Sequence, residues 1–201
     1  MAARSEAYTK FIASMEMDFD TWHDGTGYDL EALGQLEGAE RQEVEKLLLR
    51  RAGSDWRDKE ALAALGSKPA IAALKSQFEA GRTLRDRVDA AAELLELGKL
   101  DDVAPVLSEA LRVDGDFSVF SRAMDLIGWH KVIATLPALL AVAEKGPGDK
   151  AVHAAAMACF LQGITEEPFD WDLRPFFLRF NEGDAERRKA YAELLEKLGQ
   201  G

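Results

Sequence analysis

The sequence predicts an all-α protein in which antiparallel helix pairs stack into a right-handed α-solenoid. Apolar residues recur at spacings of three and four along most of the chain, as on one face of an amphipathic helix. Glycines that would end the first helix of each pair recur at a period near thirty, since Gly66, Gly98, Gly128 and Gly163 are 32, 30 and 35 residues apart. A fixed period with one helix pair in each copy is typical of an α-solenoid.

The clearest copy of the repeating unit spans residues 87 to 111, RVDAAAELLELGKLDDVAPVLSEAL. Its first helix would carry an apolar stripe and end at Gly98. Asp101 or Asp102 can cap the second helix, and Pro105 suits its first turn, where a missing N–H costs little. Neither helix could bury its apolar stripe alone, so the unit requires neighbours.

The same reasoning assigns elements along the whole chain, which we expect to form a single domain. Helices are predicted at 5–17, 29–36 and 40–51, with a loop at 18–28. The predicted helix pairs are 54–65 with 70–74, 87–97 with 103–111, 117–127 with 136–143, and 149–161 with 173–180. Residues 1–53 would form an N-terminal helical cap with an acidic loop, 54–183 the repeats, and 184–201 a C-terminal capping helix.

Two of these units, WRDKEALAALGSKPAIAAL and the stretch 87–111, resemble HEAT-like repeats of the short bacterial type. The shared features are an early Arg or Asp, an alanine-rich run, Leu-Gly, an acidic turn and a proline at the second helix. The resemblance covers about residues 54 to 163, and the third and fourth copies depart from it. It implies a fold rather than an activity, because that family includes adaptors, chromophore lyases, DNA-repair enzymes and inhibitors.

The charge of the chain is strongly acidic and unevenly distributed. The formal net charge of the 201 residues is −11. Residues 18–40 hold seven acids and no Lys or Arg, and residues 101–125 hold six acids against two arginines. Such a surface repels nucleic acid and anionic membranes and can steer a basic protein towards it, although acidity can also serve solubility alone. We therefore expect a basic protein partner, no nucleic acid and no membrane.

The ends and the cysteine content point to a cytoplasmic protein. The first residues, MAARSEAYTKFIASM, lack the apolar core of a signal peptide, and the run 132–143 is too short to span a bilayer. Cys159 is the only cysteine, which precludes an intrachain disulfide, and its alanine-rich surroundings predict a buried thiol. We expect a monomer when the partner is absent.

The acidic aromatic segment DFDTWHDGTGY, residues 18–28, has three interpretations. Asp20, Asp24, Gly25 and Glu31 match a calcium loop, but Trp22 and Gly27 fall where a ligand and a packing residue belong. The segment could instead form an exposed recognition patch, because aromatic residues dominate binding hot spots. Alternatively, its aromatic residues pin the loop to the first repeat while its acids cap helices.

A second cluster, Asp55 to Asp58, lies at a predicted helix start. It could cap that helix and pack Trp56, with Arg57 paired to a neighbouring acid, or it could extend the binding patch. The residues predicted to bind a partner are Asp20, Trp22, His23, Asp24, Tyr28, Asp29, Glu31, Trp56 and Asp58.

Catalytic motifs are missing from the sequence. His23, His130 and His153 have no second His or Cys at metal-ligand spacing, and neither a phosphate loop nor a GxSxG elbow is present. The aromatic run 169–180 is predicted to form the core of the last repeat. We expect no catalytic residue, no cofactor and no metal.

The expected function is a non-catalytic protein-binding module, most specifically a bacterial immunity protein that neutralises a cognate toxin, for example a nuclease. The alternatives are an enzyme or chromophore-lyase-like protein on a HEAT-like scaffold, and a structural adaptor in a larger complex.

Overall fold

The computed structural model describes residues 4–16, 18–19, 23–51 and 55–199. Within these ranges the chain is helical, with turns and irregular segments between the helices and no β-strand, so the predicted all-α class is confirmed. The contacts between Cα atoms divide the chain into two compact units, Met1–Asp101 and Asp102–Gly201. Each unit is described by itself below.

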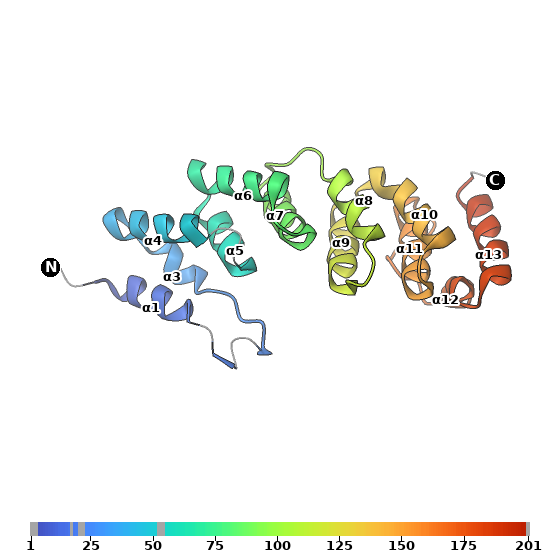
Figure 1. Ribbon diagram of the computed structural model, residues 1–201, viewed down its shortest axis with the longest axis horizontal. Helices are drawn as coiled ribbons and strands as arrows, with labels where there is room; N and C mark the ends of the chain where they lie inside the picture. Colours follow the sequence, from blue (N-terminus) through green and yellow to red (C-terminus); the bar gives the residue numbers. More distant parts are fainter. Residues whose placement is uncertain (1–3, 17, 20–22, 52–54, 200–201) are drawn as a thin grey trace. The chain divides into compact units, whose positions relative to one another are not determined.

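Unit 1 contains six helices among its described residues (Figure 1): α1 (Glu6–Ser14), α3 (Leu30–Gly34), α4 (Gly38–Arg51), α5 (Trp56–Leu65), α6 (Lys68–Ala80) and α7 (Leu84–Glu96). Helix α6 packs against α7, and α5 contacts both of them. Helix α4 contacts α5 and α6, while α3 contacts both α1 and α5. Leu48, Leu62, Leu74 and Leu94 are fully buried in the core that these helices share.

The helix starts of unit 1 follow from short polar side chains. Ser5 Oγ accepts a hydrogen bond from the Tyr8 N–H and Ser67 Oγ accepts one from the Ala70 N–H, as N-cap residues do. Thr83 and Asp86 form a reciprocal capping box that begins α7 earlier than the apolar pattern predicted. Helix α5 ends at Gly66, whose φ of 60° lies in the left-handed region that glycine adopts readily.

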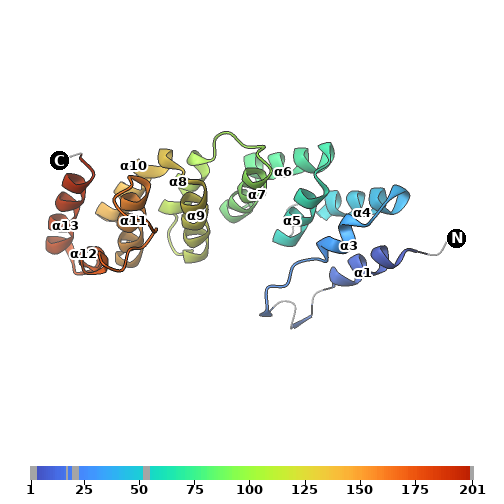
Figure 2. The same ribbon diagram turned by 180° about the vertical axis from the view of Figure 1, so that it is seen from behind.

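Unit 2 contains the remaining helices (Figure 2): α8 (Ala104–Arg112), α9 (Phe117–His130), the 3-10 helix η1 (Ile133–Thr135), α10 (Leu136–Lys145), α11 (Gly148–Leu161), α12 (Arg174–Leu178), the 3-10 helix η2 (Arg179–Asn181) and α13 (Asp184–Lys197). Helix α10 packs along α11, and α8 contacts α9 and α10. Helix α9 contacts α11, and α13 packs on η2 and α10.

Helix α11 forms the centre of unit 2. Ten of its fourteen residues are buried, and five of these are alanines, whose small side chains allow close approach of α9, α10, α12 and η2. Cys159 lies fully buried on this helix, as its alanine-rich surroundings predicted. Burial raises the pKa of the Cys159 thiol to about 11, because the thiolate would lose its hydration.

The prediction that a helix ends at Gly128 is wrong. Helix α9 continues through Gly128 to His130, and Lys131 takes the left-handed conformation with a φ of 47°. A Cβ added at Gly128 would lie 3.3 Å from Met157 Cε and 3.6 Å from Pro168 Cγ. This glycine therefore permits close packing within the last turn of the helix, a role that sequence spacing alone does not distinguish from a helix stop.

The helix pair that looked clearest in the sequence is divided between the units. Helix α7 belongs to unit 1, where it packs on α5 and α6, and α8 belongs to unit 2, where it packs on α9 and α10. No helix in the described part of the chain is long and apolar enough to cross a membrane.

Candidate partner-binding surfaces

The residues predicted to bind a partner do not share one environment. Asp20 and Trp22 lie outside the described residues. His23 and Asp24 are exposed, and His23 Nδ1 lies 2.9 Å from Asp24 Oδ1. The ring of Phe19, also exposed, stacks on the His23 ring with 5.8 Å between centroids. These exposed rings and carboxylates offer a polar aromatic surface.

Asp29 and Glu31 lie at the start of α3. The Asp29 side chain accepts a hydrogen bond of 2.8 Å from the Ala32 N–H, and its own backbone N–H donates to Ser14 Oγ at 2.9 Å. Asp29 therefore caps α3 and ties it to the end of α1. Glu31 is exposed in the first helical turn, where a negative charge is favourable.

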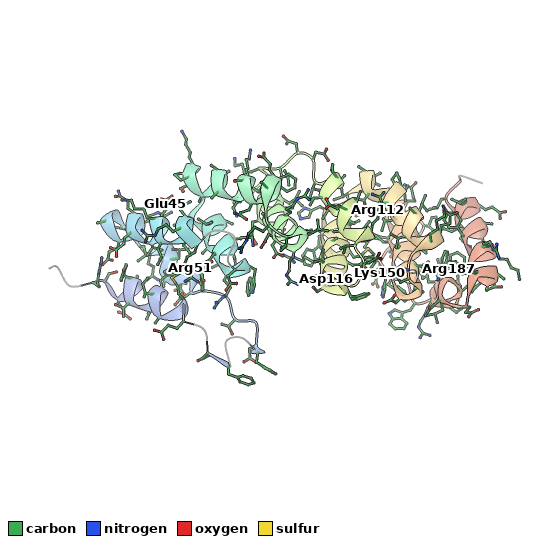
Figure 3. The ribbon with its side chains drawn as sticks, in the orientation of Figure 1. Glu45, Arg51, Arg112, Asp116, Lys150 and Arg187 are labelled. Carbon is green, nitrogen blue, oxygen red and sulfur yellow. The ribbon has the colours of Figure 1, made fainter. Side chains whose placement is uncertain are left out.

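Tyr28 and Asp58 are buried, with 5% and 0% of their surfaces exposed. The Tyr28 hydroxyl donates to Asp58 Oδ1 at 3.0 Å, and Arg51 Nε donates to the same oxygen at 3.2 Å. Arg51, labelled in Figure 3, also donates from Nη2 to the Tyr28 hydroxyl oxygen at 3.3 Å. These bonds fasten the end of the acidic segment to α4 and α5. In this arrangement neither Tyr28 nor Asp58 presents its side chain to a partner.

Burial dominates the protonation behaviour of this cluster. It raises the pKa of Tyr28 to about 12, with a further contribution from the neighbouring Asp58 carboxylate. Burial also raises the pKa of Asp58, and hydrogen bonds from Tyr28 and Arg51 offset that effect only in part. The second carboxylate oxygen of Asp58 has no hydrogen-bond partner among the described residues.

Trp56 remains partly accessible at the start of α5. Its surface is 41% exposed. Asp55 accepts from the Arg57 N–H at 3.1 Å and from the Arg57 side-chain Nε at 3.0 Å, so Asp55 caps the helix and pairs with a buried arginine. A Cβ added at Gly27 would lie 3.8 Å from the Trp56 ring, which places the acidic segment against this tryptophan.

Unit 2 carries a surface pocket of about 280 Å³ that sequence reasoning missed. The lining residues come from helix α9, from helix α11 and from the segment between α11 and α12. Its lining residues are Phe117, Phe120, Ser121, Met124, Asp125, Gly128, Trp129, His153, Met157, Pro168 and Phe169.

Besides its buried apolar face, helix α9 has a second face of mixed character that lines the pocket. Val119, Ala123 and Ile127 are buried against the rest of unit 2. Residues 117, 121, 124, 125, 128 and 129 recur at helical spacing on another face and line the pocket instead. Phe117 is 46% exposed and Trp129 is 67% exposed, so this second face is left open to solvent.

Aromatic rings follow one another across the pocket. The His153 ring lies 6.4 Å from Phe117 and 5.7 Å from Phe169, measured between centroids. Phe169 in turn lies 5.9 Å from Trp171, which is 72% exposed. The predicted aromatic core of the last repeat is thus only partly observed, because Phe176, Phe177 and Phe180 are buried whereas Trp171 faces solvent.

Carboxylates surround this aromatic surface. Residues 164–172, ITEEPFDWD, hold four acids and no Lys or Arg. A second hollow of about 500 Å³ lies along the same segment and is lined by Glu166, Glu167, Asp170 and Asp172. Together, residues 114–129 and 149–172 hold eight acids against Arg122 and Lys150. Lys150 is buried and donates to the Val113 carbonyl at 2.6 Å. The Arg174 guanidinium lies 5.6 Å from the centre of the Trp171 ring, so cations are present around this surface but acids outnumber them.

The described residues contain no group of three His, Cys, Asp or Glu side chains placed to hold a metal ion. This includes the described part of the acidic segment, while Asp20, the first residue of the calcium-loop alignment, lies outside it.

No family model, curated protein or solved structure matches the chain.

Proposed function

We propose that this chain is a non-catalytic protein-binding module that engages a basic partner protein through a surface of aromatic and acidic side chains. The observation that carries the proposal is the open face of unit 2, where Trp129 and Trp171 are mostly exposed beside a segment that contains only acidic charges. Large aromatic side chains are costly to leave in water and are enriched in binding hot spots. Surrounding carboxylates favour a partner of opposite charge and accelerate its encounter.

The exposed part of the acidic segment in unit 1 is a second surface of the same character. His23 and Asp24 offer a ring and a carboxylate there, and Glu31 on α3 and Trp56 on α5 are also accessible. The resemblance to HEAT-like repeats supports the proposal further, because stacked helix pairs present extended surfaces to macromolecules. Within each unit, the packing of α5 on α6 and α7, and of α8 on α9 and α10, is compatible with such a right-handed solenoid.

In its most specific form, the proposal is that the chain is a bacterial immunity protein, which occludes the active cleft of a basic toxin such as a nuclease. Small size, acidity and the absence of a catalytic motif in the sequence are compatible with this role. The encounter would be steered by charge, and the exposed aromatic residues would anchor the complex.

The test is isolation of the protein from its native host, with the genes that neighbour its own left intact, followed by reconstitution from purified components. We expect a stoichiometric complex with a basic protein whose Kd weakens as ionic strength rises, because salt screens exposed charges. Recovery of no reconstitutable partner, or of an acidic one whose binding ignores salt, would refute the proposal.

A further inference from the structure

The pocket on unit 2 has the chemistry of a receptor for one side chain. Its volume of about 280 Å³ is at the small end of ligand sites and exceeds what a single water requires. Ring surfaces from Phe117, Trp129 and Phe169 line it, and Met124 and Met157 add flexible thioethers. Methionine side chains adapt to the shape of an incoming group.

The charge of the pocket favours a cation. Asp125 lies in the lining, where His153 is the one basic side chain among the described lining residues and no Lys or Arg accompanies it. The neighbouring acidic hollow extends the negative potential along residues 164–172. Ring faces attract cations through their quadrupole, and a carboxylate beside them adds a charge-assisted hydrogen bond.

The geometry points to an arginine side chain from a basic segment of the partner protein as the occupant of this pocket, with its guanidinium held against the aromatic rings and paired with Asp125. This inference rests on the proposed function and specifies the anchor through which it operates. Arginine suits the site better than a compact ammonium group, because its planar guanidinium stacks on rings and can donate two parallel hydrogen bonds to one carboxylate.

An apolar side chain is the alternative occupant, and the same residues argue against it. Burying Asp125 beneath an aliphatic group would remove water from a carboxylate and supply no hydrogen bond in return. The surrounding acids would also gain no counter-charge from an apolar segment.

The experiment uses the full chain and three synthetic peptides of identical lysine-containing sequence that differ only at the central position. That position holds arginine, its uncharged isostere citrulline, or norleucine. Binding is measured by calorimetry and by amide chemical shifts. We expect the arginine peptide to shift amides of α9, α11 and residues 164–172, and the citrulline peptide to bind about ten-fold more weakly, the range of one desolvated cation–π and charge pair.

Two protein variants separate specific recognition from general attraction. Asp125→Asn removes the carboxylate with little change of shape, and Glu182→Gln removes an exposed charge of unit 2 that does not line the pocket. We expect Asp125→Asn to weaken the arginine peptide and to reduce, without abolishing, its advantage over citrulline, because the cation–π contribution of the rings remains. Glu182→Gln should leave that advantage intact.

The inference is overturned if the norleucine or citrulline peptide binds as tightly as the arginine peptide, if Glu182→Gln acts as strongly as Asp125→Asn, or if no peptide binds at this pocket. These failures are distinguishable from failure of the proposed function. A native basic partner that binds normally to Asp125→Asn but not to a Trp129→Ala, Trp171→Ala double variant would preserve the function and eliminate the arginine anchor.

Discussion

The hydroxyl of Tyr28 donates a 3.0 Å hydrogen bond to Oδ1 of Asp58, and both side chains are buried. This bond joins the acidic segment to α5 across thirty positions of sequence. It shows that an aromatic residue beside a run of acids can hold a loop in place instead of meeting a partner.

Replacing Tyr28 by Phe should lower the free energy of unfolding by about 1–3 kcal/mol, because buried Asp58 would lose a donor while its surroundings stay dry. Urea titration measures the change. Tyr8→Phe is the matched control, since the Tyr8 hydroxyl donates to exposed Glu43 at 2.9 Å and water can replace it. If Tyr28→Phe and Tyr8→Phe lost equal free energies of unfolding, burial of the hydrogen bond would not be the cause of the loss.

Asp58 should make stability depend on pH in a definite direction. Burial raises its pKa in the folded state above the ordinary value of 3.8, so the folded protein holds this proton more tightly than the unfolded chain does. The resulting stabilisation is complete below about 3.8 and is lost as pH rises through the folded-state pKa. The difference in free energy of unfolding between the wild type and Asp58→Asn should therefore fall with rising pH in urea titrations across the acidic range. A difference that grows with pH would contradict this sign.

The buried cation Lys59 should depend on Asp86. Lys59 is 1% exposed and its Nζ lies 3.2 Å from Asp86 Oδ1. Asp86→Ala would leave that ammonium without its carboxylate and should cost about 3–5 kcal/mol of unfolding free energy. Thr83→Ala removes only the partner of Asp86 in the capping box and should cost about 1 kcal/mol, which makes it the control for helix capping. If the two variants lost similar amounts of unfolding free energy, the loss in Asp86→Ala would come from helix capping and not from the ion pair with Lys59.

Trp129→Ala combined with Trp171→Ala should weaken partner binding by about 2 kcal/mol or more, close to thirty-fold in Kd, if these side chains are anchors. Their exposure predicts little change in the melting temperature, because exposed substitutions mostly alter stability by about 0.5 kcal/mol or less. Calorimetry with the purified partner and a thermal melt of the free protein measure the two effects. A large fall in melting temperature would instead assign the tryptophans to the core of unit 2.

Cys159 should resist thiol reagents in the native protein. Its burial and a pKa of about 11 keep the thiol protonated and inaccessible at neutral pH. An aromatic disulfide reagent should react slowly with the native chain and rapidly in denaturant. Rapid labelling of the native chain would show that α11 is exposed more often than its burial indicates.

Local signals made most helices predictable. Ser5, Ser67 and Gly66 act through neighbours in sequence, so their capping roles could be inferred before any packing was known. The prediction at Gly128 was wrong because two kinds of glycine look alike in a single sequence. One ends the helix that contains it, and the other lets a neighbouring segment pack closely against that helix.

The binding surfaces were harder to predict, for a physical reason. Tyr28 and Trp56 both lie beside acids in the sequence. Tyr28 is buried with its hydroxyl bonded to buried Asp58, whereas Trp56 remains accessible, and the sequence does not distinguish the two cases. The unit 2 pocket combines Phe117, His153 and Phe169, which belong to α9, α11 and the segment after α11. Helical periodicity describes one element at a time, so it could not indicate that these rings meet.

The assignment of α7 to unit 1 determines where the chain can be divided for expression. A fragment cut before Arg87, where the sequence repeat begins, would break α7 and remove Val88, Ala91 and Leu94 from the helices they cover. A cut between Asp101 and Asp102 leaves the helix contacts within each unit complete. Fragment boundaries for this protein should follow spatial packing and not the period of its sequence.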